Sequence, residues 1–486
     1  MRKKFICGLA AAAVLTAALF SGCGDGKGGY DKLLDKNDPV TIKIWHYYNG
    51  VQQTQFDEMV SEFNDTVGRE KGIYVEAYSK NSVSELAGSV LASVNKDPGA
   101  EDAPDIFGTY VETAYQIDKL GKLADLNAYF SDEEKAEYVE EYIAEGVFGG
   151  DGSMKIFPTA KSTEVMILNL TDWEDFADAK GVTYDDMATW EGLTRVAEEY
   201  YNYTDALTPE VENDGRAFFG RDSMANYMII GAKQLGHPFA NADKDGNVNV
   251  GADKDTVKKL WDNFYVPYVK GYYASEGRFR SDDVKTGTVI ALICSTTGAA
   301  YYPSEVTIGD EDAYPISNIV LKVPNFEGTE PYAVQQGAGM SVIRSNDKKE
   351  YASTVFLKWF TEEERNIRFS AHSGYLPVKK AANDTGKISE GAASKISGTM
   401  LDTLGIAIEE IGEYELYTSP PFDKSAETRD FIGEFIEKSA KDDHAAAWER
   451  IKAGEERDKV LEEYTSDTAF DAWYDTFEKG LDSVSK

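Results

Sequence analysis

The stretch Val40-Thr-Ile-Lys-Ile-Trp45 alternates apolar and polar residues, which is the pattern of a β-strand entering the fold. Apolar side chains then recur between Phe56 and Phe63 at the spacing of one helix face. Further strands are predicted at residues 72–78 and 104–107, with a second amphipathic helix between them. Strand, helix, strand, helix and strand in this order indicate a largely parallel α/β sheet.

The same kinds of element continue along the chain. A helix is predicted at residues 190–203, and a strongly amphipathic one at residues 352–360. From Asp402 onward the pattern predicts mostly helix. Further strands are predicted at residues 154–158, 165–169, 287–294, 319–323 and 339–343.

Composition and charge exclude several classes of protein. A chain of 486 residues suits two or three domains, and 42% hydrophobic residues can fill their cores. The 85 acidic residues outnumber the 50 basic ones, so the net charge is −35. Such a field repels phosphate backbones, and we therefore expect no nucleic-acid partner. Three cysteines cannot form a disulfide framework, and Cys294 is expected to be a small buried hydrophobe.

The first residues have the features of an export signal. A basic start precedes the apolar run 6–20, which is shorter than the ~20 residues that span a bilayer. The run ends in Leu19-Phe20-Ser21-Gly22-Cys23, which resembles the bacterial lipobox, although Phe20 stands where leucine is preferred. We predict a signal peptide at 1–22, a lipid on Cys23 and a tether at 23–39. The alternative is an ordinary cleaved signal with an incidental cysteine.

Signatures of catalysis are mostly absent from the sequence. The chain has no Gly-x-Ser-x-Gly elbow, no phosphate-binding loop, no His-Glu-x-x-His and no Cys-x-x-Cys, and its four histidines are scattered. We therefore predict no enzyme activity, no metal centre and no cofactor. Residues 241–249 resemble the start of a calcium loop, but Ala252 replaces the final glutamate, and a β-hairpin turning at Asp245-Gly246 is the preferred interpretation.

Aromatic residues stand beside small polar ones where predicted strands end. Ligands of open α/β sheets bind outside the carboxyl ends of the strands, and aromatic faces stack on sugar rings. We therefore predict a sugar site there, although a core role for Trp45 is an open alternative. The candidates are Trp45, Tyr47, Tyr48, Tyr110, Glu112, Tyr115, Lys161, Ser162, Thr163, Glu164, Ser295, Thr296 and Tyr301.

Several segments together resemble the extracellular solute-binding proteins of carbohydrate ABC importers, the group that includes the maltose-binding and glycerol-3-phosphate-binding proteins. The segments occur in the family's order and spacing between about residues 40 and 380. They are Ala103-Pro-Asp-Ile-Phe107, Leu120-Gly-Lys-Leu-Ala-Asp-Leu126, Ile156-Phe-Pro158 with Asn169 and Trp190-Glu-Gly-Leu193, Gly337-Ala-Gly-Met340 and Ser373-Gly-Tyr-Leu-Pro377. The sequence departs from the family at Asn169-Leu-Thr-Asp172, and its last hundred residues match no family pattern.

The resemblance implies a two-lobed periplasmic-binding-protein fold of type II, with the ligand in the cleft between the lobes. It implies one lobe of residues 40–160 and 300–360 and another of 161–299 and 361–486. The chain would cross between them near 158–164, 295–300 and 360–364. Gly337 and Tyr375 match residues that line such clefts. The implied partners are a small solute and a membrane permease, and we expect a monomer anchored on the outer face of a bacterial membrane.

Three functions remain open from the sequence. The first is a lipid-anchored binding protein that delivers a mono- or oligosaccharide to an ABC importer by hinge closure. The second is a surface hydrolase of glycans with paired carboxylates. The third is a binding protein for a non-sugar or phosphorylated solute, such as a glycerophosphodiester or a phosphonate, for which Lys161, Arg221 or a helix N-terminus would supply donors.

Overall fold

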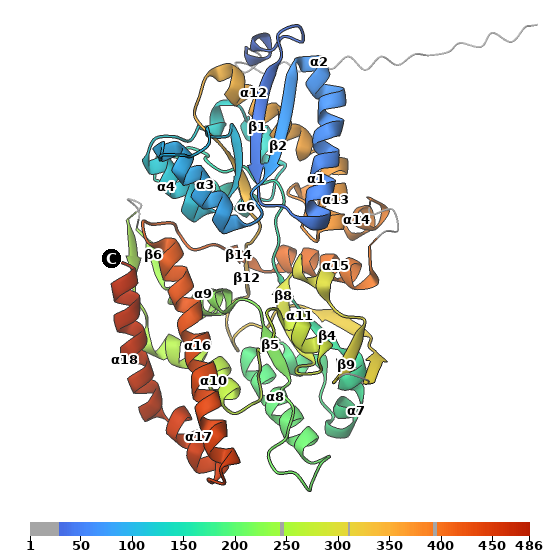
Figure 1. Cartoon of the computed structure of the whole chain (residues 1–486), viewed down its shortest axis with the longest axis vertical. Helices are drawn as coiled ribbons and strands as arrows, with labels where there is room; N and C mark the ends of the chain where they lie inside the picture. The colour runs from blue at the N-terminus through green and yellow to red at the C-terminus, as the bar shows by residue number, and fades with distance from the viewer. Residues whose placement is uncertain (1–28, 244–246, 310–311, 392–395) are drawn as a thin grey trace, which may run out of the picture.

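The computed structural model describes residues 29–243, 247–309, 312–391 and 396–486, and the chain forms two lobes stacked end to end (Figure 1). Cys23 and the predicted signal peptide lie outside the described residues. No helix among the described residues combines the length and apolarity that a membrane span requires.

The first lobe is built on a four-stranded sheet in the order β13-β3-β1-β2. Strand β1 is parallel to β2 and β3, whereas β13 is antiparallel to β3. Alternate residues of β1 are buried from Val40 to Ile44, as the sequence pattern predicts, and Trp45 and His46 at its end are buried as well. The strands are β1 (Val40–His46), β2 (Ile73–Ser79), β3 (Ile106–Thr109) and β13 (Gly339–Val342).

Two apolar cores cover this sheet. Ile42 and Ile44 belong to the core that α1, α12 and α13 close, where the ring of Phe63 meets that of Phe356 edge-on at 5.2 Å. Trp45 lies in the other core, under α3 and α4. The helices are α1 (Gly50–Phe63), α2 (Arg69–Lys71), α3 (Val83–Asn95), α4 (Val111–Lys119), α5 (Asp132–Ala136), α6 (Glu140–Glu145), α12 (Asp347–Phe360) and α13 (Glu363–Ser373), with the short turns η1 (Tyr30–Leu33), η2 (Asn64–Gly68), η3 (Leu126–Ala128) and η6 (Lys380–Ala382).

The second lobe has its own sheet, in the order β11-β4-β8-β5. Strand β4 is buried along its whole length, because Met166 and Leu168 enter one core while Val165 and Ile167 enter another. Only β5 and β8 are parallel to each other; β4 is antiparallel to both β8 and β11. The strands are β4 (Glu164–Asn169), β5 (Phe219–Arg221), β8 (Ala291–Ser295), β11 (Asn318–Leu321) and the short β9 (Glu305–Ile308) and β10 (Asp312–Pro315).

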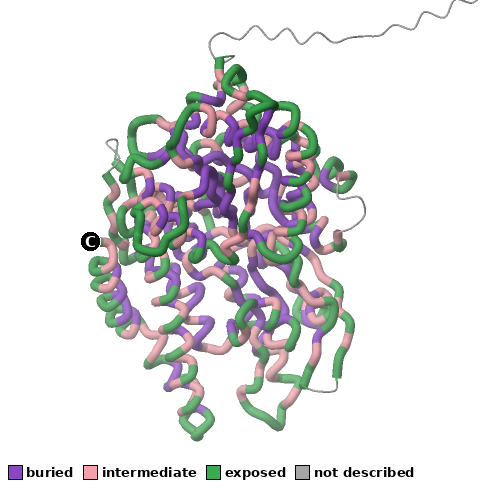
Figure 2. Tube along the Cα trace, turned by 45° about the horizontal axis from the view of Figure 1, so that its top comes forward, coloured by how far each residue is buried: buried purple, intermediate pink, exposed green. Residues whose placement is uncertain are grey.

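Helices from two distant parts of the chain complete the second lobe. The C-terminal helix α16 packs on α9 and α10, and α18 packs back on α16, so the last residues run along the outside of the lobe (Figure 1). The helices are α7 (Leu170–Lys180), η4 (Tyr184–Met187), α8 (Trp190–Asp205), α9 (Met224–Gln234), α10 (Lys254–Val269), α11 (Arg280–Lys285), η5 (Gly298–Tyr301), α14 (Thr385–Gly391), α15 (Gly398–Glu413), α16 (Ser425–Lys452), α17 (Arg457–Thr465) and α18 (Asp467–Val484). Buried residues follow the inner elements of both lobes, and exposed ones the outer loops (Figure 2).

The structure corrects the expected division of the chain. Residues 300–321 stay with the second lobe, because β11 pairs with β4 there. Helix α13 belongs to the first lobe, since Phe369 lies in the core over the first sheet. The crossings expected near 295–300 and 360–364 therefore lie near 335–338 and after Val378, whereas the chain does cross at 158–164.

The first connecting segment is bonded to two later parts of the chain. Lys161 pairs with Leu376, and Ser162 pairs with Gln336, each in an antiparallel bridge. Two short strand pairs flank them: β12 (Tyr332–Val334) with β14 (Glu415–Tyr417), and β6 (Ala240–Ala242) with β7 (Val248–Val250). The second pair confirms the expected hairpin, although its turn residues Asp245 and Gly246 lie outside the described residues.

The expected tether is shorter than predicted. Residues 30–33 form a 3-10 turn rather than a free linker. The ring of Tyr30 lies 5.0 Å from that of Tyr129 and 5.6 Å from that of Tyr351, and Asp31 accepts a hydrogen bond from the Tyr351 hydroxyl. These contacts fix the chain to the first lobe from Tyr30 onward.

Candidate functional site

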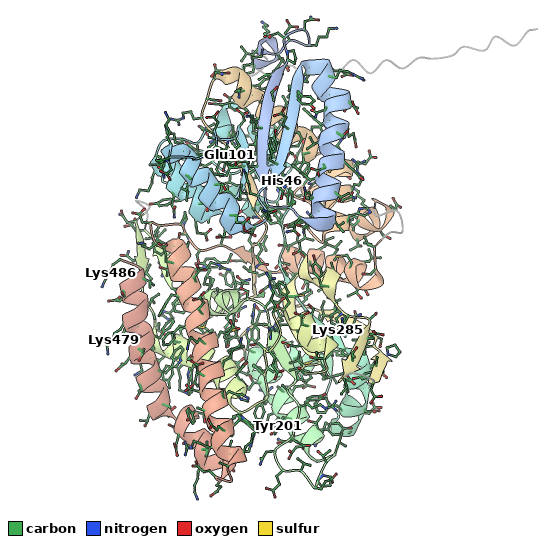
Figure 3. The ribbon with its side chains drawn as sticks, viewed as in Figure 1. His46, Glu101, Tyr201, Lys285, Lys479 and Lys486 are labelled. Carbon is green, nitrogen blue, oxygen red and sulfur yellow. The ribbon has the colours of Figure 1, made fainter. Side chains whose placement is uncertain are left out.

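Two sizeable hollows of the described structure lie between the lobes. Strand β1 of the first lobe runs toward the second lobe and ends at His46 (Figure 3). One cavity of about 470 Å³ lies between α3 and α4 on one side and α9, β12 and α16 on the other. A second of about 520 Å³ adjoins it, and both are lined by Glu145, Gln335 and residues 417–419. Both volumes fall in the range of pockets that bind small molecules.

Unpartnered polar groups line the first cavity. The Gln335 side chain is 7% exposed and that of Thr428 is 3% exposed, yet Gln335 Nε2 and Thr428 Oγ1 have no hydrogen-bond partner among the described residues. Gln336 Oε1 and Thr418 Oγ1, two buried atoms of half-buried residues, likewise have no hydrogen-bond partner among the described residues. A buried polar atom without a partner costs about 1–3 kcal/mol, so a ligand that pairs with these atoms recovers that cost.

A chain of buried hydrogen bonds ends in this cavity. Arg221 Nη2 lies 2.5 Å from Glu164 Oε2, and Asn226 Nδ2 donates to Glu164 Oε1 at 2.9 Å. Arg429 Nη2 in turn donates to Asn226 Oδ1 at 2.5 Å. Glu164, Arg221 and Asn226 are all at most 4% exposed. The guanidinium of Arg429 is thus held by a neutral amide, and its charge is not neutralised by a carboxylate within ion-pair distance in the described structure.

The first-lobe wall of the cavity carries carboxylates. Glu145 is paired with the fully buried Lys161, whose Nζ lies 2.5 Å from the Glu145 carboxylate and 2.6 Å from the carbonyl oxygen of Gly337. Glu112 has no ion pair among the described side chains, and burial raises its pKa. Burial also raises the pKa of the neighbouring Tyr110, which is therefore a neutral hydroxyl at pH 7.

Some candidates from the sequence reach the cleft. Tyr110 and Glu112 line the first cavity, and Tyr115 lines the second. Thr163, Glu164 and Arg221 line a narrow space of about 10 Å³ beside it, which is room for about one water molecule.

Other candidates line neither cavity in the described structure. Trp45 packs under α3 and α4, and Tyr48 packs between Phe56 and Phe369, so both are core residues. Tyr301, the last residue of η5, is 75% exposed. The rest are buried or half-buried in or beside the connecting segments, and they are Tyr47, Lys161, Ser162, Ser295, Thr296, Gly337 and Tyr375.

The pleat of β1 explains why the aromatic wall was misplaced. Trp45 faces the core because residues that alternate along a strand point to opposite faces, and both faces of this sheet are covered by helices. The hydroxyl of Tyr47 is hydrogen-bonded to that of Tyr375 at 3.1 Å, so both rings are fixed inside the lobe. Being next to a strand end did not suffice to place an aromatic side chain in the cleft.

Sequence reasoning missed the second-lobe wall of the cleft. Asn226, Gln335, Thr418, Thr428 and Arg429 come from segments that carry no family pattern or no strand-end signal. One signal was present: Tyr417-Thr-Ser-Pro-Pro421 places an aromatic beside two small hydroxyls before a pair of prolines, which is typical of an ordered loop.

The described residues contain no group of three or more His, Cys, Asp or Glu side chains arranged to hold a metal ion. Burial lowers the pKa of His46 to about 4, so this ring is neutral at pH 7. The cleft therefore presents hydroxyl, amide, carboxylate and guanidinium groups, which are suited to binding a polar solute.

Comparisons with known proteins agree with this architecture. A cyclic α-maltosyl-1,6-maltose binding protein from Arthrobacter globiformis has 19% identity and a TM-score of 0.66, over 92% of this chain and 99% of that one. UgpB from Mycobacterium tuberculosis, solved with glycerophosphocholine, has 16% identity and a TM-score of 0.63, over 92% and 98%. An ABC substrate-binding protein from Listeria monocytogenes, solved with cycloalternan, has 18% identity and a TM-score of 0.62, over 90% and 99%.

At these identities the solved structures show a shared fold. Among curated proteins, none matches this chain by sequence. A family model of bacterial extracellular solute-binding proteins matches residues 58–395, which is well over half of the chain. The chain therefore belongs to the family of bacterial extracellular solute-binding proteins.

Proposed function

We propose that this protein is the lipid-anchored substrate-binding component of an ABC importer, and that it captures a mono- or oligosaccharide in its cleft and delivers it to the permease. The observation that carries the proposal is the set of unpartnered buried groups in the first cavity, Gln335 Nε2 and Thr428 Oγ1 above all. Sugar hydroxyls both donate and accept hydrogen bonds, so they can pair with amide, hydroxyl and carboxylate groups together.

The position of these groups supports a hinge mechanism. Gln335 and Gln336 line the first cavity from one of the segments that connect the lobes, and Glu112 lines the wall that the first lobe contributes. A ligand that touches both walls binds the closed arrangement better than the open one, and therefore shifts the population toward closure. The permease would recognise that closed form.

A variant pair tests the role of the cavity. Thr428→Val removes an unpartnered hydroxyl from the cavity, whereas Thr403→Val removes an equally buried, unpartnered hydroxyl on α15 that lines neither hollow. Both changes should leave the melting temperature of the free protein equal or higher, because each removes an orphaned polar atom. Only Thr428→Val should weaken sugar binding, by about 3- to 10-fold for one net hydrogen bond.

The ligand itself should be found by a thermal-shift screen of the mature chain against saccharides, followed by calorimetry. A ligand at 100 times its dissociation constant stabilises by about 2.7 kcal/mol. Glycerophosphodiesters and phosphonates belong in the same screen as the alternative class. If no saccharide of any charge raises the melting temperature, the carbohydrate proposal is wrong; if sugars are cleaved during incubation, the protein is a glycan hydrolase instead.

The anchor is tested separately. Cys23→Ser should move the protein from the membrane fraction to the medium, because two acyl chains give durable membrane binding and a bare tether gives none. Retention of the Cys23→Ser protein in the membrane fraction at the wild-type level would refute lipidation. Size-exclusion chromatography with light scattering would test the proposed monomer.

A further inference from the structure

The start of α16 brings several hydrogen-bond donors to one end of the first cavity. The lining there includes Ser425, Thr428 and Arg429, together with Gln335 from the connecting segment. Helix α16 is 28 residues long, and in the described structure the side chain of its N-cap, Lys424, accepts no hydrogen bond from the backbone amides of the first turn and instead donates to the Glu427 carboxylate. The amide groups of an uncapped helix start carry partial positive charge, which favours an anion nearby.

Two of these donors are buried and have no partner among the described residues. Gln335 Nε2 is an N–H donor on a side chain that is more than nine-tenths buried, and Thr428 Oγ1 is a hydroxyl that is equally buried. Both line the cavity beside the helix start. This is a separate indication that a ligand group occupies this end, since buried donors in folded proteins are rarely left unpaired.

The guanidinium of Arg429 is fixed in the same place by a buried network. Its Nη2 donates to Asn226 Oδ1, and the amide of Asn226 is oriented by its second bond, to Glu164. Glu164 already neutralises Arg221, so the network supplies Arg429 with an acceptor but with no countercharge. An arginine held this way keeps N–H groups and a full positive charge for a planar or tetrahedral oxyanion.

The carboxylates of the cavity do not cancel this charge directly. Glu145 is compensated by Lys161, and Asp430 is exposed to solvent, which screens it. Glu112 lies on the opposite wall, and the described structure contains no ion pair between it and Arg429. Burial raises the pKa of Glu112 and outweighs the opposite effect of the positive charge of Arg429, so the protonated form of Glu112 is more accessible than that of an exposed glutamate.

We infer that the α16 end of the cleft is a subsite for an oxyanion group, a carboxylate, phosphate or sulfate, carried on the saccharide. This inference rests on the proposed function and narrows its substrate class to acidic sugars. Arg429, Gln335 and Thr428 would donate to the oxyanion, and the rest of the cleft would bind the sugar ring. The net charge of −35 opposes attraction of such a ligand at long range, so the affinity must come from these local donors.

The test uses saccharides that differ only in one group: neutral, uronate, phosphorylated, sulfated and amine-bearing forms of the same sugars, measured by thermal shift and calorimetry. At least one oxyanion form should bind about 10-fold or more tightly than its neutral counterpart, which is the worth of one hydrogen bond to a charged group. The preferred form distinguishes carboxylate from phosphate and sulfate.

Arg429→Gln should reduce the affinity for the oxyanion form to that for the neutral form and leave the neutral form nearly unchanged. Lys424→Gln is the matched control, because it removes the same charge from the same helix at a residue that does not line the cavity. It should preserve the preference. Arg429→Lys keeps the positive charge and should retain part of the preference for the oxyanion form. This second variant keeps the test informative if the Arg429→Gln protein does not fold.

Neutral sugars that bind as tightly as their oxyanion forms would overturn the inference and leave the proposed function intact. Tightest binding of the amine-bearing forms would also overturn it, and would assign the dominant role to Glu112. If the preference for the oxyanion form survives Arg429→Gln, Arg429 does not bind the oxyanion, and the subsite inferred here is wrong. Absence of binding by every saccharide would overturn the proposed function as well.

Discussion

The buried pair of Glu164 and Arg221 gives the sharpest stability prediction. Their side chains are 5% and 1% exposed, and Arg221 also lies over the rings of Trp190 and Tyr227 at 5.5 and 5.7 Å. Glu164→Ala leaves that guanidinium buried without a countercharge. Removing one partner of a buried pair costs about 3–5 kcal/mol, so the free energy of unfolding should fall by that amount.

A double variant separates the ion pair from simple loss of packing. Arg221→Met alone strands the Glu164 carboxylate and should cost a similar amount. Glu164→Leu with Arg221→Met replaces the pair by apolar groups of similar size, and only the Asn226 amide loses an acceptor. That loss costs about 1–3 kcal/mol, well below the sum of the single changes.

Urea denaturation, followed by circular dichroism and by tryptophan fluorescence, measures these differences. Lys438→Ala is the control, since its pair with Asp442 is 77% and 62% exposed and should contribute less than about 1 kcal/mol. The reasoning is refuted if Glu164→Ala costs less than about 1 kcal/mol, or if the double variant costs as much as the two single variants together.

Three further predictions follow from other buried groups. Burial raises the pKa of Glu410 to about 8, so the folded protein favours the protonated acid. The free energy of unfolding should therefore fall as pH rises from about 4.5 to about 8, at up to ~1.4 kcal/mol per pH unit. Glu410→Gln should flatten this pH dependence in thermal melts across that range, and an unchanged slope would contradict the prediction. Tyr48→Ala should lower the free energy of unfolding by about 3–5 kcal/mol in urea denaturation, because Tyr48 is 2% exposed in the core. A decrease below about 1 kcal/mol would contradict the core position and favour a position in the cleft. Gly337→Ala should lower the melting temperature, because φ is +84° and a Cβ would lie 2.6 Å from the Ala160 carbonyl oxygen; a variant as stable as the wild type would show that the connecting segment adapts.

Much of the fold could be read from local patterns. The alternation at Val40–Trp45 and the helix face at Phe56–Phe63 depend on neighbouring residues alone, and both elements form where they were predicted. The order of segments identified the two-lobed architecture, and the family model agrees with it. The helical character of the C-terminal residues could also be predicted from the sequence, because apolar residues recur along α16 at the spacing of one helix face.

The composition of the cleft was decided by tertiary structure. Tyr48 and Tyr110 both follow strands of the first sheet, yet one enters the core and the other lines the cavity, because helices α1 and α13 close over one strand end and not over the other. Gln335 and Thr428 are polar residues with no local signal in the sequence. They line the same cavity only because the chain crosses between the lobes at Gln335 and begins helix α16 close to Thr428. Local sequence sets which elements form, but long-range packing sets which of their side chains are left without a partner, and a binding site is made of those.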